Sequence, residues 1–247
     1  IADTAVTTPL MFENRLVRQA RSDRRRIVLP EGDDERILRA ADQILRRSIC
    51  DLTILGNADT IMDRARSMGL TLSGATLIHP EHSELRDEMA ALLCDLRGHK
   101  GMSMDIAHDA VTDVTIFGTL LVKSGLADGM VSGASHTTAD TVRPALQLIR
   151  TNEGVSVVSS VFFMCLADKV LVYGDCAVNP DPAPEQLADI AISSASTAAA
   201  FGVDPYVAML SYSTGASGTG GDVEKVRAAT ALAQFRRPDI PNEGLIQ

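Results

Sequence analysis

The sequence predicts an α/β fold in which parallel strands alternate with helices. Short runs of β-branched and other apolar residues recur along the 247 residues, separated by longer segments whose apolar residues have helical spacing. Polar, glycine-rich stretches follow strands or precede helices, which is where open α/β sheets place their ligands. The length allows one large domain or two smaller ones, and a substantial aliphatic core is expected.

Before Thr151 the apolar pattern predicts three strands, at residues 27–29, 52–55 and 128–131. Residues 30–33 form a turn between the first strand and a helix that extends to about residue 48. Gly56-Asn57 form the turn after the second strand. Further helices are expected at residues 58–67, 80–96, 104–110, 114–123 and 138–150. Ser124-Gly125 end the helix at 114–123.

After Thr151 the character of the chain changes. Residues 155–166 are rich in β-branched and aromatic residues, as a buried central strand would be, and residues 169–173 are expected to pair with them in antiparallel fashion. A stiff, proline-rich segment leads to an Ala/Ser-rich helix at 185–201, followed by a strand at 206–210, a Gly/Ser loop and a helix at 222–235. No helix or strand is expected at residues 241–247. We therefore predict a first α/β domain at residues 1–151 and a second at 152–247.

The composition excludes a membrane-embedded or disordered chain. Hydrophobic residues make up 45% and charged residues 22%, which is the mix of an ordinary soluble globular protein. No stretch approaches the ~20 uninterrupted apolar residues of a membrane-spanning helix, and the first residues lack the pattern of a signal peptide. A cytoplasmic protein is expected.

The net charge of −9 argues against a broad nucleic-acid surface, because such surfaces need lysines and arginines to neutralise phosphates. Most of the basic residues precede Thr151, so arginines that handle an anionic ligand should come mainly from the first part of the chain. The arginine-rich run at residues 21–26 is expected to be a solvated connector rather than a binding patch.

The four cysteines, Cys50, Cys94, Cys165 and Cys176, are scattered along the sequence. They form no C-x-x-C pair and have no histidine at ligand spacing, so neither a metal site nor a disulfide framework is indicated. Reduced and mostly buried thiols are expected.

The polar stretch from Asp128 to Pro144 is the first candidate for a ligand site. Its glycines allow backbone N–H groups to turn toward a ligand, and a helix that starts near Thr138 adds the positive end of its dipole. Arg143 would lie within the first two turns of that helix and could clamp an oxyanion. The alternative is a capping loop with a surface arginine.

A second candidate is the Gly/Ser-rich stretch from Ser211 to Gly221, between a strand and a helix. It fails the P-loop pattern, because the positions for Lys and for Ser or Thr hold Gly221 and Asp222. It also fails the dinucleotide fingerprint, whose third glycine would fall on Val223. A nucleoside triphosphate or NAD site is disfavoured, and a flexible solvent loop remains the alternative.

The third candidate is the run Arg97-Gly98-His99-Lys100, whose basic side chains suit a phosphate group but also suit the C-terminal end of a helix dipole. His136 has no Cys or Ser nucleophile paired with it in a recognisable pattern. This favours a structural loop histidine over a general base.

At these same stretches the chain resembles the phosphate acetyltransferase family, from about Phe12 to Gln247. The resemblance rests on Ile-Val-Leu-Pro-Glu from Ile27, Leu-Arg-x-His-Lys-Gly from Leu96, Asp-Gly-x-Val-Ser-Gly-Ala-x-His with the following x-Arg-Pro-Ala-Leu-Gln helix from Asp128, and Ala-Met-Leu-Ser-Tyr-Ser-Thr from Ala208. It implies two open α/β domains with a cleft between them, as in the isocitrate and isopropylmalate dehydrogenases. It also implies transfer of an acetyl group between acetyl phosphate and coenzyme A, with no permanently bound cofactor and a homo-oligomeric protein.

The resemblance implies site residues as well. Arg143 and Thr138 would hold the acyl phosphate as catalytic residues, and Arg97 would contact coenzyme A. The other substrate-binding residues implied are Ser132, Gly133, Ser211, Ser213, Thr214 and Gly215. The family's catalytic aspartate and a Ser-Arg pair are expected after Gln247, in a segment that would complete the first domain. The first domain is therefore expected to be incomplete and this chain alone inactive, and the second domain is expected to be partial.

The implied reaction is direct attack of the coenzyme A sulfur on acetyl phosphate, without a metal or a covalent enzyme intermediate. A phosphate butyryltransferase would share the loops and differ in the width of its acyl pocket. A non-catalytic acetyl-CoA-sensing domain, as in some malic enzymes, would bind acetyl-CoA without exchanging phosphate. An NAD-linked decarboxylating dehydrogenase would need clustered metal-binding aspartates, which the sequence does not offer.

Overall fold

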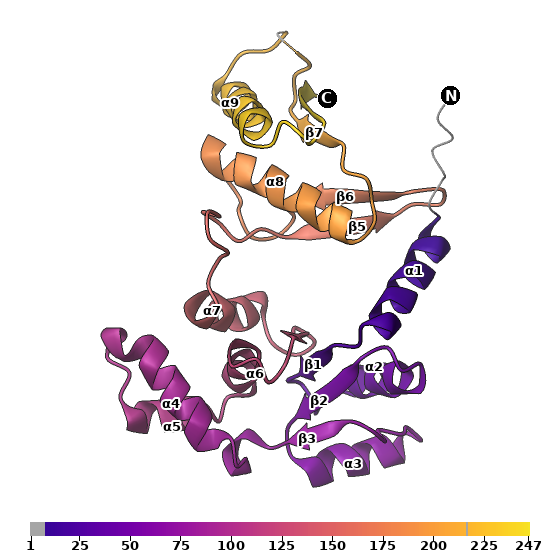
Figure 1. The fold of residues 1–247 in the computed structure, drawn as a ribbon, viewed down its shortest axis with the longest axis vertical. Coiled ribbons are helices and arrows are strands. Elements are labelled where there is room, and N and C mark those ends of the chain that lie inside the picture. The colour runs from indigo at the N-terminus through magenta and orange to yellow at the C-terminus, as the bar shows by residue number, and fades with distance from the viewer. Residues whose placement is uncertain (1–7, 216) are drawn as a thin grey trace. The chain divides into compact units, whose positions relative to one another are not determined.

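The computed structural model describes residues 8–215 and 217–247. The chain divides into two compact units: one is Val17–Arg150, and the other combines the residues up to Leu16 with Thr151–Gln247. In Figure 1 the first unit runs from indigo to magenta, and the later part of the second runs from orange to yellow. No helix of the described residues is long and apolar enough to cross a membrane.

The unit Val17–Arg150 contains a parallel sheet. Its strands are β1 (Arg26–Leu29), β2 (Asp51–Leu55), β3 (Thr76–Ile78) and β4 (Gly129–Met130), in the order β3-β2-β1-β4. The expected parallel sheet is confirmed, and the strands at 27–29, 52–55 and 128–131 lie within a residue of the observed bounds. β3 was not predicted, because three residues are too few to show a period.

Helices cover both faces of this sheet, since successive residues of a strand point to opposite sides. Val28 and Leu55 pack in one core cluster with α4 (Arg86–Arg97), α5 (Met104–Ala110), α6 (Val114–Lys123) and α7 (Thr138–Leu148). Leu29 and Ile54 pack in another with α2 (Glu35–Arg46) and α3 (Ala58–Ser67). Figure 1 shows this layered arrangement around β1 to β3.

One glycine keeps β1 and β2 close where the chain enters α2. A Cβ atom on Gly32 would lie 2.5 Å from the backbone oxygen of Leu55, a distance that real Cβ atoms do not show. The N–H of Gly32 donates to that same oxygen over 3.2 Å. Gly32 therefore fixes the path of the chain just after Glu31.

Three of the predicted helices, α3, α5 and α6, have the bounds expected from sequence. The helix expected at 80–96 is instead divided into a short 3-10 helix, η1 (Pro80–His82), and α4. Ser83 has extended dihedral angles and ends η1, which explains the division. A second 3-10 helix, η2 (Gly98–Lys100), follows α4 directly.

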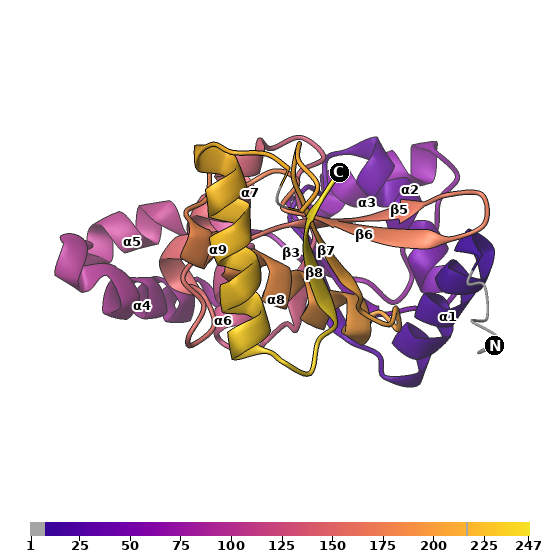
Figure 2. The ribbon, with the colours of Figure 1, turned by 90° about the horizontal axis from the view of Figure 1, so that it is seen from above.

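The other unit contains two small sheets and two long helices. β5 (Val161–Cys165) pairs antiparallel with β6 (Val170–Gly174), as expected, while β7 (Val207–Leu210) pairs parallel with β8 (Asn242–Ile246). α8 (Pro184–Ala200) and α9 (Gly221–Arg236) pack together through small residues such as Ala188, Ala191 and Ala229, and α9 lies beside β7 and β8 (Figure 2). The alanine-rich composition permits this close packing.

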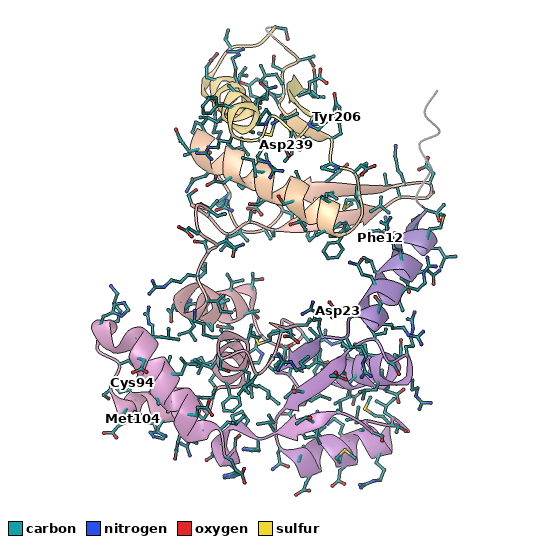
Figure 3. All side chains as sticks on the ribbon, viewed as in Figure 1. Phe12, Asp23, Cys94, Met104, Tyr206 and Asp239 are labelled. Carbon is teal, nitrogen blue, oxygen red and sulfur yellow. The ribbon has the colours of Figure 1, made fainter. Side chains whose placement is uncertain are left out.

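The helix α1 (Pro9–Ser22) contributes one side chain to a cluster of aromatic rings in this unit. The ring centroid of Phe12, labelled in Figure 3, lies 5.4 Å from that of Phe163, which lies 4.5 Å from that of Phe201. Arg15 donates from Nη2 to the backbone oxygen of Phe201 over 2.9 Å.

Three expectations about this part of the chain and its thiols are wrong. The buried central strand expected at 155–166 is the short β5, in which Phe162 is 55% exposed, because it has only β6 as its partner among the described residues. Residues 242–246 were expected to be irregular, and they form β8. The thiols were expected to be mostly buried, but Cys165 is exposed and the other three are half-buried, and all four are free.

Candidate functional site

The end of β1 places a buried carboxylate beneath the loop that leads into α7. The side chain of Glu31 has an exposed fraction of 0%. It accepts hydrogen bonds from the backbone N–H groups of Gly133, Ala134, Ser135 and His136 over 3.0, 2.8, 2.7 and 2.8 Å. One carboxylate thus satisfies four consecutive backbone donors of the loop.

Two side chains complete this arrangement. The hydroxyl of Ser135 donates to Glu31 over 3.2 Å, and Nδ1 of His136 lies 2.9 Å from Oε1 of the same carboxylate. Burial on its own would raise the pKa of Glu31, but the hydrogen bonds from Ser135, Ala134 and His136 outweigh it and lower the pKa to about 2. Glu31 is therefore ionised at neutral pH.

These hydrogen bonds change the function expected for the N–H groups of the loop before α7. Its N–H groups were expected to turn toward an anionic ligand, and the anion they bind is the side chain of Glu31. Sequence reasoning missed Glu31, although its place offered a signal. Glu31 lies two residues after β1, and β4, which precedes the loop, is the neighbour of β1 in the sheet. Carboxyl ends of adjacent parallel strands bring such residues together.

The helix α7 begins with a capping box. Thr137 is its N-cap, the N–H of Asp140 donates to the Thr137 hydroxyl over 3.2 Å, and that hydroxyl donates to the Asp140 carboxylate over 2.7 Å. The hydrogen bonds that the Asp140 carboxylate accepts from the hydroxyl and the backbone N–H of Thr137 lower the pKa of Asp140. Thr138 is the first residue of the helix and is exposed, and Ser132 accepts a hydrogen bond from the hydroxyl of Thr141 over 3.2 Å.

A cavity of about 270 Å³ lies within the unit Val17–Arg150, and it brings together Arg97, Arg143 and His136. The guanidinium group of neither arginine makes a hydrogen bond or ion pair with any residue that the structure describes. The remaining lining residues come from α4 to α7 and the turns between them: Leu93, Met102, Ala110, Asp113, Thr115, Ile116, Asp140, Pro144, Gln147 and Leu148. Ser132, Gly133 and Thr138 are not among them.

Arg97 is the last residue of α4 and is half-buried, with its neighbours His99 and Lys100 exposed on η2. Figure 3 marks Cys94, one turn earlier on α4, and its thiol donates to the backbone oxygen of Met102 over 3.4 Å. Only Arg97 of the three basic residues lines the cavity. The tertiary structure therefore singles out one member of the basic run.

The loop after β7 lies in the other unit. Ser213 is buried, and its hydroxyl shares a hydrogen bond of 3.2 Å with that of Ser217, while Ser211, Thr214 and Gly215 reach the surface. The N–H of Gly215 donates to the backbone oxygen of Leu245 over 3.0 Å, at a φ of +58° that favours glycine. This loop is ordered by its own contacts and by β8.

The absence of a metal site was an expectation from sequence, and it stays a prediction. At the end of β3, His79, Glu81 and His82 each offer a ligand atom, and these atoms lie within 4.8 Å of one another. The imidazoles of His79, which precedes η1, and His82, its last residue, stack with centroids 4.7 Å apart. None of the three lines the cavity.

Comparison with known proteins gives one family throughout. A family model described as phosphate acetyl/butaryl transferase matches residues 11–247. The chain is 55% identical over 240 residues to the phosphate acetyltransferase of Nitratidesulfovibrio vulgaris, covering 97% of this chain and 34% of that protein. It is 50% identical over 239 residues to the phosphate acetyltransferase of Corynebacterium glutamicum, covering 96% and 72%. The chain thus spans about a third of the first relative's length.

Solved structures agree with this. A phosphotransacetylase from Streptococcus pyogenes superposes with a TM-score of 0.91 at 39% identity, covering 96% of this chain and 73% of that one. The EutD phosphotransacetylase of Staphylococcus aureus gives a TM-score of 0.87 at 42% identity, covering 96% and 71%. The mixed α/β fold with a parallel sheet is therefore common to these proteins and this chain.

The buried carboxylate yields a prediction about stability. Replacing Glu31 with Gln removes the charge that four backbone donors face, so we expect Glu31→Gln to lower the free energy of unfolding at pH 7 by about 2–4 kcal/mol. The folded pKa of about 2 lies below the ordinary 4.5, so the wild-type contribution is complete above pH 4.5 and is lost as the pH falls toward 2. Urea unfolding should show that the difference in free energy of unfolding between wild type and Glu31→Gln becomes smaller as the pH falls over that range.

The matched control is Glu35→Gln, an exposed glutamate in the first turn of α2. It should change stability by less than about 1 kcal/mol. A Glu31→Gln protein as stable as wild type at pH 7 would contradict the role given to this carboxylate.

Proposed function

Because the chain belongs to the phosphate acetyl/butaryl transferase family, we propose that it carries out the transfer of an acetyl group between phosphate and coenzyme A. The observation that carries this proposal is the cavity lined by both Arg97 and Arg143, whose guanidinium groups form no hydrogen bond or ion pair with the described residues. Two such guanidinium groups at one cavity suit an anionic ligand, because each offers several donors to phosphate oxygens. The volume of about 270 Å³ suits a small acyl phosphate rather than a whole coenzyme A molecule.

The roles proposed for the residues start from this cavity and from the beginning of α7. Arg143, which lines the cavity, holds the acyl phosphate, and Thr138, the first residue of α7, contributes from the helix N-terminus, which adds its positive end. Arg97, at the end of α4, contacts coenzyme A. Ser132 contributes from the loop before α7, and Gly133 shapes that loop, since its N–H is already bound to Glu31.

The loop after β7 is proposed as a further substrate-binding segment. The surface positions of Ser211, Thr214 and Gly215 leave them free to contact a ligand. Ser213 supports them, since its hydroxyl is engaged by Ser217. The two-domain architecture of the isocitrate and isopropylmalate dehydrogenases, and assembly into a homo-oligomer, are part of the same proposal.

The chemistry proposed is direct transfer with coenzyme A as a substrate and no permanently bound cofactor. The sulfur of coenzyme A attacks the carbonyl carbon of acetyl phosphate, an S–C bond forms, and the C–O bond to phosphate breaks. A thiol with a pKa near ~8.5 is mostly protonated at pH 7, so a base must take its proton as attack begins. Arg143 offsets the charge on the departing phosphate.

The function itself is tested by acetyl-CoA formation from acetyl phosphate and coenzyme A, measured on the protein that carries this chain. We expect turnover with acetyl phosphate, and slower turnover with butyryl phosphate. A protein that binds acetyl-CoA but exchanges no phosphate would instead be a sensing module. Faster turnover with butyryl phosphate would identify a butyryltransferase.

Arg143→Ala should lower turnover about 10²-fold or more, because it removes a charge that acts on the phosphate in the transition state. Steady-state kinetics with acetyl phosphate measure this. Arg39→Ala, on an exposed arginine of α2 outside the cavity, is the matched control and should keep the wild-type rate. Unchanged kinetics in Arg143→Ala would rule out the role.

Arg97→Ala should raise the KM for coenzyme A and leave turnover nearly unchanged, which is the pattern of lost ground-state binding. The measurement varies coenzyme A at saturating acetyl phosphate and then the reverse. A rise in the KM for acetyl phosphate alone would show that the roles of Arg97 and Arg143 are exchanged.

A further inference from the structure

Transfer of an acetyl group from phosphate to sulfur leaves a proton to be placed on phosphate. When the C–O bond of acetyl phosphate breaks, the phosphate oxygen that carried the acetyl group gains a negative charge. A fully deprotonated phosphate is too basic to leave readily at neutral pH, so a proton must reach it as the bond breaks. A base near the coenzyme A thiol removes the proton from sulfur, but it does not by itself deliver a proton to the departing phosphate oxygen.

The structure contains a histidine suited to this task. His136 lines the cavity together with Arg143, the residue proposed to hold the phosphate. Its side chain is 30% exposed, so it is neither sealed in the core nor free in solvent. Its Nε2 makes no hydrogen bond with the residues that the structure describes, and so it can donate to a ligand.

Glu31 fixes this ring. The carboxylate lies 2.9 Å from Nδ1 and also accepts the backbone N–H of the same residue over 2.8 Å. Since Glu31 is ionised and can only accept, Nδ1 carries a hydrogen atom, which leaves Nε2 as the nitrogen that gains or loses a proton. A buried carboxylate that orients an imidazole in this way is the pattern by which proteins prepare a histidine for proton transfer.

Charged groups of both signs surround the cavity that His136 lines. Glu31 lies against its ring, and Asp113 and Asp140 line the same cavity. Arg97 on α4 and Arg143 on α7 line it as well and bring positive charge. A phosphate group held by the two arginines would therefore lie in the cavity that His136 also lines.

We propose that His136, held by Glu31, is the catalytic residue that transfers the proton on the phosphate side; this rests on the proposed function. As the S–C bond forms and the C–O bond breaks, protonated Nε2 gives its proton to the departing phosphate oxygen. The proton removed from the thiol restores the imidazolium through solvent, so the products are acetyl-CoA and singly protonated phosphate. In reverse, neutral Nε2 takes the proton from the attacking phosphate. Glu31 is a positioning residue.

The test compares two acyl donors. Acetyl phosphate needs a proton on its leaving group, whereas methyl acetyl phosphate releases methyl phosphate, a much weaker base that leaves without one. We expect His136→Gln to lower turnover about 10²-fold or more with acetyl phosphate and less than about fivefold with methyl acetyl phosphate.

The control is His108→Gln on α5, whose Nδ1 lies 3.7 Å from a carboxylate oxygen of Asp87 outside the cavity. It should behave as wild type with both donors, and thermal unfolding should show that both variants are folded. If His136→Gln does not fold, His136→Asn takes its place.

Each outcome separates the two proposals. Equal losses with both donors, or turnover within about threefold of wild type on both, would overturn the role of His136 and leave the acetyl transfer standing. A wild-type protein with no acetyl transfer would overturn the proposed function and this inference with it.

Discussion

The arrangement of the candidate site depends on one interaction, the binding of the Glu31 carboxylate by consecutive backbone N–H groups of the loop before α7. The loop joins β4 to α7, and Glu31 lies two residues after β1, so the interaction ties the end of β1 to the start of the helix that carries Thr138 and Arg143. A buried charge is tolerated only when it is fully hydrogen-bonded, and these donors meet that condition. The sheet, the loop and the helix are thereby placed as one unit, and His136 is oriented by the same group.

The elements that could be predicted are those specified by residues close to them in the sequence. The bounds of α3, α5 and α6 were predicted because each begins at a side chain that caps it, Asn57, Ser103 and Asp113, and because Gly125 follows α6 with a positive φ. β3 was missed because it has only three residues, and β8 was missed because its sequence, Asn-Glu-Gly-Leu-Ile, shows no alternation of apolar and polar residues. Each becomes a strand by pairing with a neighbour, β2 or β7. The composition that suggested a buried strand at 155–166 could not reveal that β5 pairs with β6 alone among the residues that the structure describes.

The residues of the candidate site also fall into those that the sequence could predict and those that it could not. Arg97 and Arg143 stood out in the sequence because each lies in a polar, glycine-bearing stretch, but only the packing of α4 against α7 places both at one cavity. Glu31 and His136 are 105 residues apart in sequence, and no local pattern connects them. The sequence therefore identified the residues that face a ligand more readily than the buried group that holds them in place. The sequence also suggested that the N–H groups of the loop bind an external anion. It could not show that they bind the carboxylate of Glu31 instead.

The loop after β7 is held by the strand that comes later in the chain. The N–H of Ser211 donates to the backbone oxygen of Ile246, and the N–H of Gly215 donates to that of Leu245. Both ends of the segment 211–215 are therefore hydrogen-bonded to β8. A short strand at the edge of a sheet opens more easily than a core helix, because few buried contacts resist its opening. When β8 detaches, Ser211 and Gly215 lose these bonds at the same moment. The loop and the strand therefore form one cooperative opening unit, and amide hydrogens in both should exchange with solvent at a common rate.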